Sequence, residues 1–216
     1  AITISNPEFT PEANYSSVYD VVACAGVAGY IFGVPVSNCV NRVNVTVAQI
    51  AKEGSATTFC PAIGGIAGYV HGSKDTAKTS ISNCVNYGAV AYNDNATARC
   101  LRPIVAGIVA FGTTDNATSI TNCVNRGPIS LNALTYGNTG AGTGEYIGGI
   151  TGRVTLGTIT SCKNEATGTI TVDGDLTSPC IGGIAGYTNN TTTTLCDNLG
   201  AIEMKATSRF MGLMVG

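Results

Sequence analysis

The sequence predicts an all-β protein: a right-handed parallel β-helix, or three-sided β-solenoid, of about five to six coils. Three observations lead to this prediction: the composition, two short motifs that recur along the chain, and the nearly constant spacing between them. Glycine accounts for 28 residues, tryptophan is absent and only 11% of the residues are charged. Abundant Thr, Val, Ile, Asn and Gly favour strands and turns over helices. The low charge and the many apolar residues are not those of a disordered chain.

The first recurring motif is Cys-x-Asn, found in stretches such as "ISNCVNYGAV" at 81–90 and "ITNCVNRGPI" at 120–129. Its five copies are Cys39/Asn41, Cys84/Asn86, Cys123/Asn125, Cys162/Asn164 and Cys196/Asn198. Alternation places the cysteines in one interior layer, where a small hydrophobic side chain packs well. We expect the asparagines at the turns, because Asn tolerates left-handed backbone. Stacked asparagines are also expected to hydrogen-bond to one another in a ladder.

The second motif is apolar and glycine-rich. Its copies surround Gly26, Gly65, Gly107, Gly149 and Gly183, and a shorter one surrounds Gly212. From the central glycine to the next cysteine the chain runs 13 to 19 residues, whereas from that cysteine to the next glycine it runs 16 to 26. The second link takes up most insertions. Each repeat holds three short segments with strand-like alternation, which cannot form a compact fold alone and are expected to stack as coils.

The domain organisation follows from the repeat. We expect residues 1–19 to form a lead-in or cap of the first coil and residues 20–216 to form the solenoid. The uncharged stretch at 21–36 is shorter than the roughly 20 residues of a membrane-spanning helix, and it matches the glycine motif, so no membrane insertion is expected. The net charge of −2 and the scattered basic residues give no field for nucleic acid. No export signal is visible, and we interpret the chain as mature or trimmed.

The succession of "GGIAGY" and "ISNCVNYGAV" resembles the GLUG-type repeat of surface proteins from Bacteroidetes and Firmicutes, which also occurs in IgA-peptidase-like proteins. The resemblance covers about residues 20–216, and the insertions at 45–60 and 131–146 depart from it. It implies a β-helical, adhesin-like module that is secreted or held at the outer cell surface. It implies no fixed catalytic residues.

Thiol and metal chemistry has little support. No two of the nine cysteines have the C-x-x-C spacing of a zinc or redox site, and the only histidine, His71, stands in "HGSKD", which is typical of an exposed turn. We therefore expect no metal, no cofactor and no Cys–His nucleophile. The cysteines are interpreted as reduced, buried thiols, with disulfides between neighbouring coils as the alternative.

Carboxylates offer one candidate pair. The acidic residues considered are Asp94, Asp115, Glu145, Asp173 and Asp175. Only Asp173 and Asp175, in "VDGD" at 172–175, stand together, and glycoside hydrolysis needs two carboxylates that converge on a cleft. An Asp-Gly turn explains the pair without catalysis, and a weak calcium site is the second interpretation. A polysaccharide-active lyase or hydrolase is thus the alternative function.

The insertions point to a binding surface. They precede the glycine motifs, so their loops are expected along one edge of the solenoid, where repeat proteins often bind ligands. Tyr92, Tyr136 and Tyr146 lie in or beside them, and aromatic rings on loops stack on sugars or anchor protein partners. We therefore expect a non-catalytic secreted or surface module. It would bind a host or microbial glycan or surface protein, or serve as a rigid spacer that presents another domain.

Overall fold

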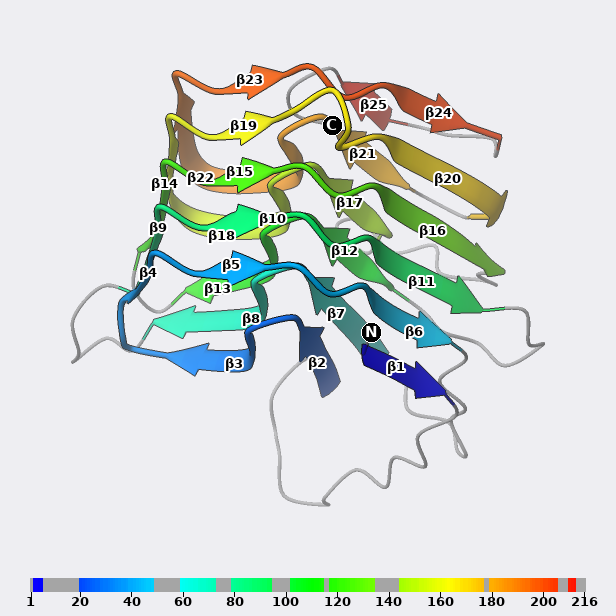
Figure 1. Cartoon of the computed structure of the whole chain (residues 1–216), viewed down its shortest axis with the longest axis horizontal. Coiled ribbons are helices and arrows are strands. Elements are labelled where there is room, and N and C mark those ends of the chain that lie inside the picture. Colours follow the sequence, from blue (N-terminus) through cyan, green and yellow to red (C-terminus); the bar gives the residue numbers. More distant parts are fainter. Residues whose placement is uncertain are drawn as a thin grey trace.

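The chain forms a parallel β-solenoid, as the sequence predicts (Figure 1). The computed structural model describes residues 2–5, 20–48, 59–72, 79–94, 102–114, 117–134, 144–176, 179–205 and 210–212. Within these ranges the regular secondary structure is entirely β, in four sheets whose paired strands all run parallel. The described residues contain no helix long and apolar enough to cross a bilayer.

Each coil passes in turn through sheets B, C, D and A. Sheet B consists of β2 (Asp20–Ala25), β7 (Phe59–Gly64), β12 (Ile104–Ala106), β17 (Tyr146–Gly148), β21 (Cys180–Gly182) and β25 (Phe210–Gly212). Sheet C consists of β3 (Ala28–Phe32), β4 (Val36–Ser37), β8 (Ala67–Gly72), β9 (Ser80–Ser82), β13 (Val109–Thr114), β14 (Thr118–Thr121), β18 (Thr151–Thr160) and β22 (Ala185–Thr194). Sheet D consists of β5 (Val40–Asn41), β10 (Val85–Asn86), β15 (Val124–Asn125), β19 (Lys163–Asn164) and β23 (Asp197–Asn198). Sheet A consists of β1 (Ile2–Ser5), β6 (Val45–Ala48), β11 (Val90–Asp94), β16 (Ile129–Leu134), β20 (Ile170–Asp175) and β24 (Ile202–Met204).

Five coils can be followed through all four sheets, from β2 to β24, within the described residues. The lead-in contributes β1, which pairs with β6, and β25 pairs with β21 beyond the fifth coil. The second coil has five strand segments, β7 to β11, where the sequence indicated three. The reason is that both motifs straddle a bend: Gly65 lies between β7 and β8, and Cys84 between β9 and β10.

Two hydrophobic clusters fill the solenoid. The first lies between sheets A and B and includes Ile63 of β7 with Val90 of β11. The second lies inside sheet C and includes Ile66 and Ile81, against which the thiol of Cys84 packs. Because Ile63 and Ile66 flank Gly65, the glycine bend marks the boundary between the two clusters.

The asparagines of the Cys-x-Asn motif form a buried ladder at this boundary. The side chain of Asn125 is fully buried. Its Nδ2 donates to Oδ1 of Asn164 at 2.8 Å and to the carbonyl of Gly127 at 2.9 Å, so both amide hydrogens are satisfied. Equivalent 2.8 Å bonds between amides connect Asn41, Asn86, Asn125, Asn164 and Asn198. The structure thus contains the ladder that the sequence predicts.

The glycine motif packs directly against this ladder. A Cβ atom added at Gly65 would overlap the side chain of Asn86 and the carbonyl of Gly107. In the next coil Gly107 faces Asn125 in the same way. Only glycine fits at these positions, because the backbone of the bend lies in close contact with the amide ladder between the two clusters.

The left-handed turn lies one residue before each cysteine. Its φ angles are 57° at Asn38, 52° at Asn83, 53° at Asn122, 54° at Ser161 and 55° at Leu195. The ladder asparagines instead lie in the short strands of sheet D and have no positive φ, so the expectation of left-handed backbone at these positions is wrong. They stand directly before a bend and bond to its backbone, as Asn86 does to the carbonyl of Gly88. The turn residues point outward and are exposed, whereas a ladder amide must point inward.

Replacement of Asn125 by alanine is expected to destabilise the fold by about 3 kcal/mol, because one buried amide hydrogen of Asn86 and the buried Oδ1 of Asn164 each lose their bond to Asn125. Chemical denaturation followed by circular dichroism measures this change. Asn132→Ala removes the same side chain from an exposed position in β16 and should change stability by no more than about 0.5 kcal/mol. Equal losses in the two variants would contradict a structural role for the ladder.

Replacement of Leu195 by asparagine is expected to stabilise the protein by about 1 kcal/mol. Left-handed backbone is unfavourable for leucine and better tolerated by asparagine, and the 84% exposed Leu195 side chain loses little apolar burial. The matched control is Leu199→Asn, since Leu199 is also exposed but has no positive φ. Thermal melts of the two variants and of the wild-type protein measure the change in melting temperature. A gain of the same size at Leu199 would show that polarity, not backbone conformation, is responsible.

Candidate functional site

Four aromatic rings lie together on the outer face of sheet C, two on β3 and two on β8. Tyr30 and Phe32 come from β3, and Tyr69 and His71 come from β8. Parallel pairing sets Tyr30 opposite Tyr69 and Phe32 opposite His71. The intervening Ile31 is buried in the second cluster, so alternation along the strand directs the rings to the outer face.

The four rings make a compact array, here called the aromatic platform. Along the strands, ring centroids are 6.4 Å apart for Tyr30 and Phe32, with a 24° interplanar angle, and 6.0 Å apart for Tyr69 and His71, at 9°. Across the strands, the spacings are 5.2 Å for Tyr30 and Tyr69 and 5.3 Å for Phe32 and His71. The Tyr30 hydroxyl lies 3.4 Å from Nδ1 of His71. Tyr30 is 53% exposed and Phe32 46% exposed, so the platform is open to solvent on the first coil.

In later coils, the outward side chains of sheet C that are in register with Tyr30 and Tyr69 pack against one another. Phe111 of β13 follows Tyr69 in register, stacks on it with a centroid distance of 5.1 Å, and is buried. In the fourth coil the row continues with Arg153, whose guanidinium lies 5.3 Å from the Phe111 ring and 5.5 Å from that of Tyr187. This packed continuation supports the platform from one side and leaves its exposed rings, Tyr30 and Phe32, on the first coil.

The tyrosines that the sequence suggested as ligand contacts do not form this site. Tyr92 is fully buried in the first cluster, because it lies two residues after the inward Val90 and therefore faces the same way. Tyr146 is only 1% exposed and packs against Tyr187, and burial raises the pKa of its hydroxyl. Neither ring can stack on a ligand from solution. Tyr136 lies outside the described residues.

The acidic pair falls at the end of β20 and not in a separate turn. Asp173 is exposed, and its Oδ1 accepts a 2.8 Å hydrogen bond from the amide of Gly174, where φ is 111°. The side chain of Asp175 lies outside the described residues. The part of the chain that the structure describes has no group of three or more His, Cys, Asp or Glu side chains arranged for a metal ion.

The motif cysteines form a row of thiols beside the ladder. Sγ of Cys123 donates to the carbonyls of Thr121 and Ile81 at 3.4 and 3.6 Å. Thiol contacts with Cys162 and Cys84, together with burial, raise the pKa of Cys123. Seven cysteines are described as free thiols, namely Cys24, Cys39, Cys84, Cys123, Cys162, Cys180 and Cys196. Of these, Cys24, Cys84, Cys123 and Cys162 are buried and the other three are half-buried. His71 lies half-buried in β8, so the expectation that it stands in an exposed turn is wrong.

The fold is that of a repeat-built parallel β-helix, with the aromatic platform on the outer face of sheet C. No protein-family model matches the chain, and no match is found among the curated proteins or the solved structures. The GLUG-type resemblance, with the surface location that it implies, therefore stays a prediction based on the two motifs.

One sequence signal could have found the platform. The residues after the first two glycine motifs read Y-I-F and Y-V-H, with aromatic side chains at alternate positions. Strand alternation around the buried Ile31 and Val70 sends these rings outward. The signal is hard to recognise because Tyr30 and Tyr69 adjoin the repeated glycine motif and "HGSKD" is typical of a turn.

The central thiols are expected to resist alkylation in the native protein. Cys84, Cys123 and Cys162 are buried, so iodoacetamide can reach them only after a coil opens, whereas Cys39 is half-buried in the first coil. Mass spectrometry after a short native reaction should show modification at Cys39 before the other three. Unfolding the chain in denaturant should abolish the difference and serves as the control. Equal native labelling of Cys123 and Cys39 would contradict the buried thiol row.

Proposed function

We propose that the chain is a non-catalytic binding module of the adhesin type, secreted or held at an outer cell surface, and that its aromatic platform binds a glycan. The observation that carries the proposal is the array of four adjacent rings with two of them about half exposed. Exposed aromatic clusters on soluble proteins are common at binding surfaces and uncommon elsewhere.

The chemistry of a sugar suits this surface. One face of a pyranose ring presents C–H groups, which pack on an aromatic ring as apolar groups do, while the hydroxyl groups project from its edge. Tyr30 and Phe32, stacked at a 24° interplanar angle, offer neighbouring ring surfaces for such contacts. The His71 imidazole and the Tyr30 hydroxyl add polar groups beside them.

Rigidity favours the same function. The rings project from paired strands, and Ile31 and Val70 anchor those strands in the second cluster. Tyr69 is further fixed by stacking on the buried Phe111. A surface that is already ordered loses little conformational entropy when a ligand binds, so even a small contact area can give useful affinity.

A spacer role is compatible with this proposal, because the continuous ladder of buried amides makes the solenoid stiff along its axis. The alternative, a polysaccharide-active enzyme, receives less support. Asp173 is bonded to the neighbouring Gly174 amide at the end of β20, which accounts for its position without a catalytic role.

A glycan array with the purified chain tests the proposal. The best glycan should bind the Tyr30→Ala/Phe32→Ala variant roughly 30-fold more weakly, since each ring contributes about 1 kcal/mol. Both side chains are about half exposed, so thermal melts should show a folded variant. The matched control is Leu199→Ala, which removes an exposed apolar side chain, 55% exposed and located after β23 of sheet D.

Two results would count against this function. Glycan binding that survives loss of both rings would move the site elsewhere on the chain. A folded wild-type protein that binds no glycan on a broad array would remove the glycan proposal and leave the spacer role.

A further inference from the structure

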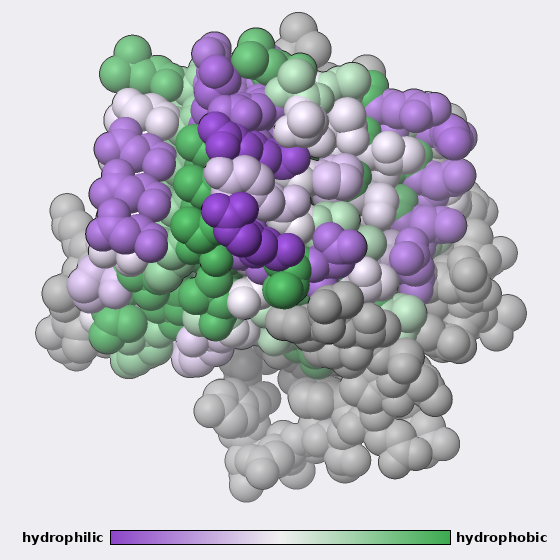
Figure 2. All heavy atoms as spheres, in the orientation of Figure 1, coloured by the Kyte–Doolittle hydropathy of each residue, from purple (hydrophilic) through white to green (hydrophobic). Residues whose placement is uncertain are grey.

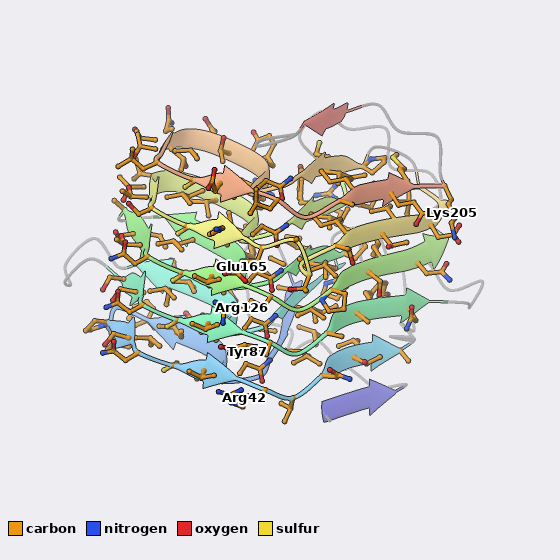
Figure 3. The ribbon with its side chains drawn as sticks, turned by 45° about the horizontal axis from the view of Figure 1, so that its top comes forward. Arg42, Tyr87, Arg126, Glu165 and Lys205 are labelled. Atoms are coloured by element: carbon orange, nitrogen blue, oxygen red, sulfur yellow. The ribbon has the colours of Figure 1, made fainter. Side chains whose placement is uncertain are left out.

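A second row of outward side chains follows sheet D, one residue after each ladder asparagine. In the first four coils it consists of Arg42, Tyr87, Arg126 and Glu165 (Figure 3). The guanidinium carbon of Arg42 lies 4.6 Å from the centre of the Tyr87 ring, and that of Arg126 lies 5.2 Å from it. Arg42 and Arg126 come from the coils on either side of Tyr87, so the guanidinium groups flank the ring from opposite sides.

The two arginines differ in their remaining partners. Arg126 donates from Nε and Nη2 to both carboxylate oxygens of Glu165, at 2.8 and 3.0 Å, and from Nη1 to the Tyr87 hydroxyl at 2.7 Å. This pairing lowers the pKa of Glu165. Arg42 is exposed, and among the described residues no carboxylate lies within ion-pair distance of it. Arg42 is therefore an exposed cation that lies over the Tyr87 ring.

An aliphatic row runs beside the arginine row. Val40, Val85 and Val124 are aligned by the pairing of β5, β10 and β15. Val40 is 48% exposed, and the other two are half-buried. Figure 2 shows the two rows as a hydrophobic and a hydrophilic band that run side by side over sheet D. We call Val40, Val85, Arg42, Tyr87 and Arg126 together the guanidinium face.

We propose that the guanidinium face is a docking surface for a polypeptide segment that carries both carboxylate and aliphatic side chains. Arg42 supplies the charge for a carboxylate, and Val40 supplies apolar surface next to it. Arginine and tyrosine are the residue types most enriched at the energetic centres of protein interfaces. A neutral glycan fits less well, because guanidinium groups lie 4.6 and 5.2 Å from the centre of the Tyr87 ring and take up part of the surface on which a sugar would stack.

The surface is independent of the aromatic platform, since it lies on sheet D and the platform on sheet C. The guanidinium face also differs from the aromatic platform in the kind of attraction that it offers to a ligand. Attraction to Arg42 should weaken as salt increases, whereas stacking on exposed rings should depend little on salt. The two sites can therefore be distinguished in one protein.

An array of short synthetic peptides tests the proposal, with the numbers of acidic and of aliphatic residues varied independently. The full chain should retain peptides that contain both types, and less at high salt. Arg42→Gln should bind the best peptide about five- to tenfold more weakly. The matched control is Lys205→Gln, which removes one exposed positive charge at the end of sheet A. The Tyr30→Ala/Phe32→Ala variant should bind the peptide normally.

Three outcomes would overturn the inference. The first is that no acidic–aliphatic peptide is retained by folded protein. The second is that Arg42→Gln and Lys205→Gln reduce binding equally, which would indicate a non-specific effect of net charge. The third is that heparin or polygalacturonate binds through Arg42 while no peptide does, which would identify an anionic glycan as the ligand. Loss of peptide binding leaves the platform proposal untouched, because its rings lie on another sheet.

Discussion

The burial of a row of amide side chains is the constraint on which the rest of the solenoid depends. An amide in an apolar interior is strongly destabilising unless its donors and acceptor are bonded. In the ladder from Asn41 to Asn198, that condition is met only when each coil stacks in register on the next, at 2.8 Å between amide atoms. A slip of one residue would exchange inward and outward side chains and break every such bond. The ladder therefore determines both the register and the close approach of the glycine bend.

The strand register that the buried ladder fixes also determines which outward side chains lie next to one another on the surface. Because Asn41 stacks on Asn86, the residues that follow them, Arg42 and Tyr87, are aligned on the outer surface. Pairing of β3 with β8 aligns Tyr30 with Tyr69 in the same way. Inward positions must repeat because their surroundings repeat, whereas outward positions carry no such requirement. A change of residue type along an outward row is therefore where function can be encoded without loss of the fold.

The parts of the structure that the sequence predicts are those fixed by repetition. The solenoid and the amide ladder follow from the constant spacing of the Cys-x-Asn motif. The position of the turn does not follow from the sequence. Asn83 and Asn86 are both asparagines, and residue type alone cannot tell which of them has left-handed backbone. Tyr92 lies beside an insertion, which suggests a loop, but it alternates with the inward Val90 and is therefore buried. The aromatic platform does not follow from repetition, because its outward positions change from coil to coil: Tyr30 and Tyr69 are followed in register by Phe111 and Arg153.

The two candidate surfaces use aromatic rings in opposite ways, and this difference decides what each can bind. Around Tyr87 the neighbours are guanidinium groups, so the ring serves to position charge. Around Tyr30 the neighbours are other rings, and about half of its surface stays open. A ring flanked by cations suits an acidic partner, and a ring flanked by rings suits the apolar face of a sugar. Since one rigid ladder fixes both sheets, a glycan on sheet C and a polypeptide on sheet D would be held in a constant relative orientation.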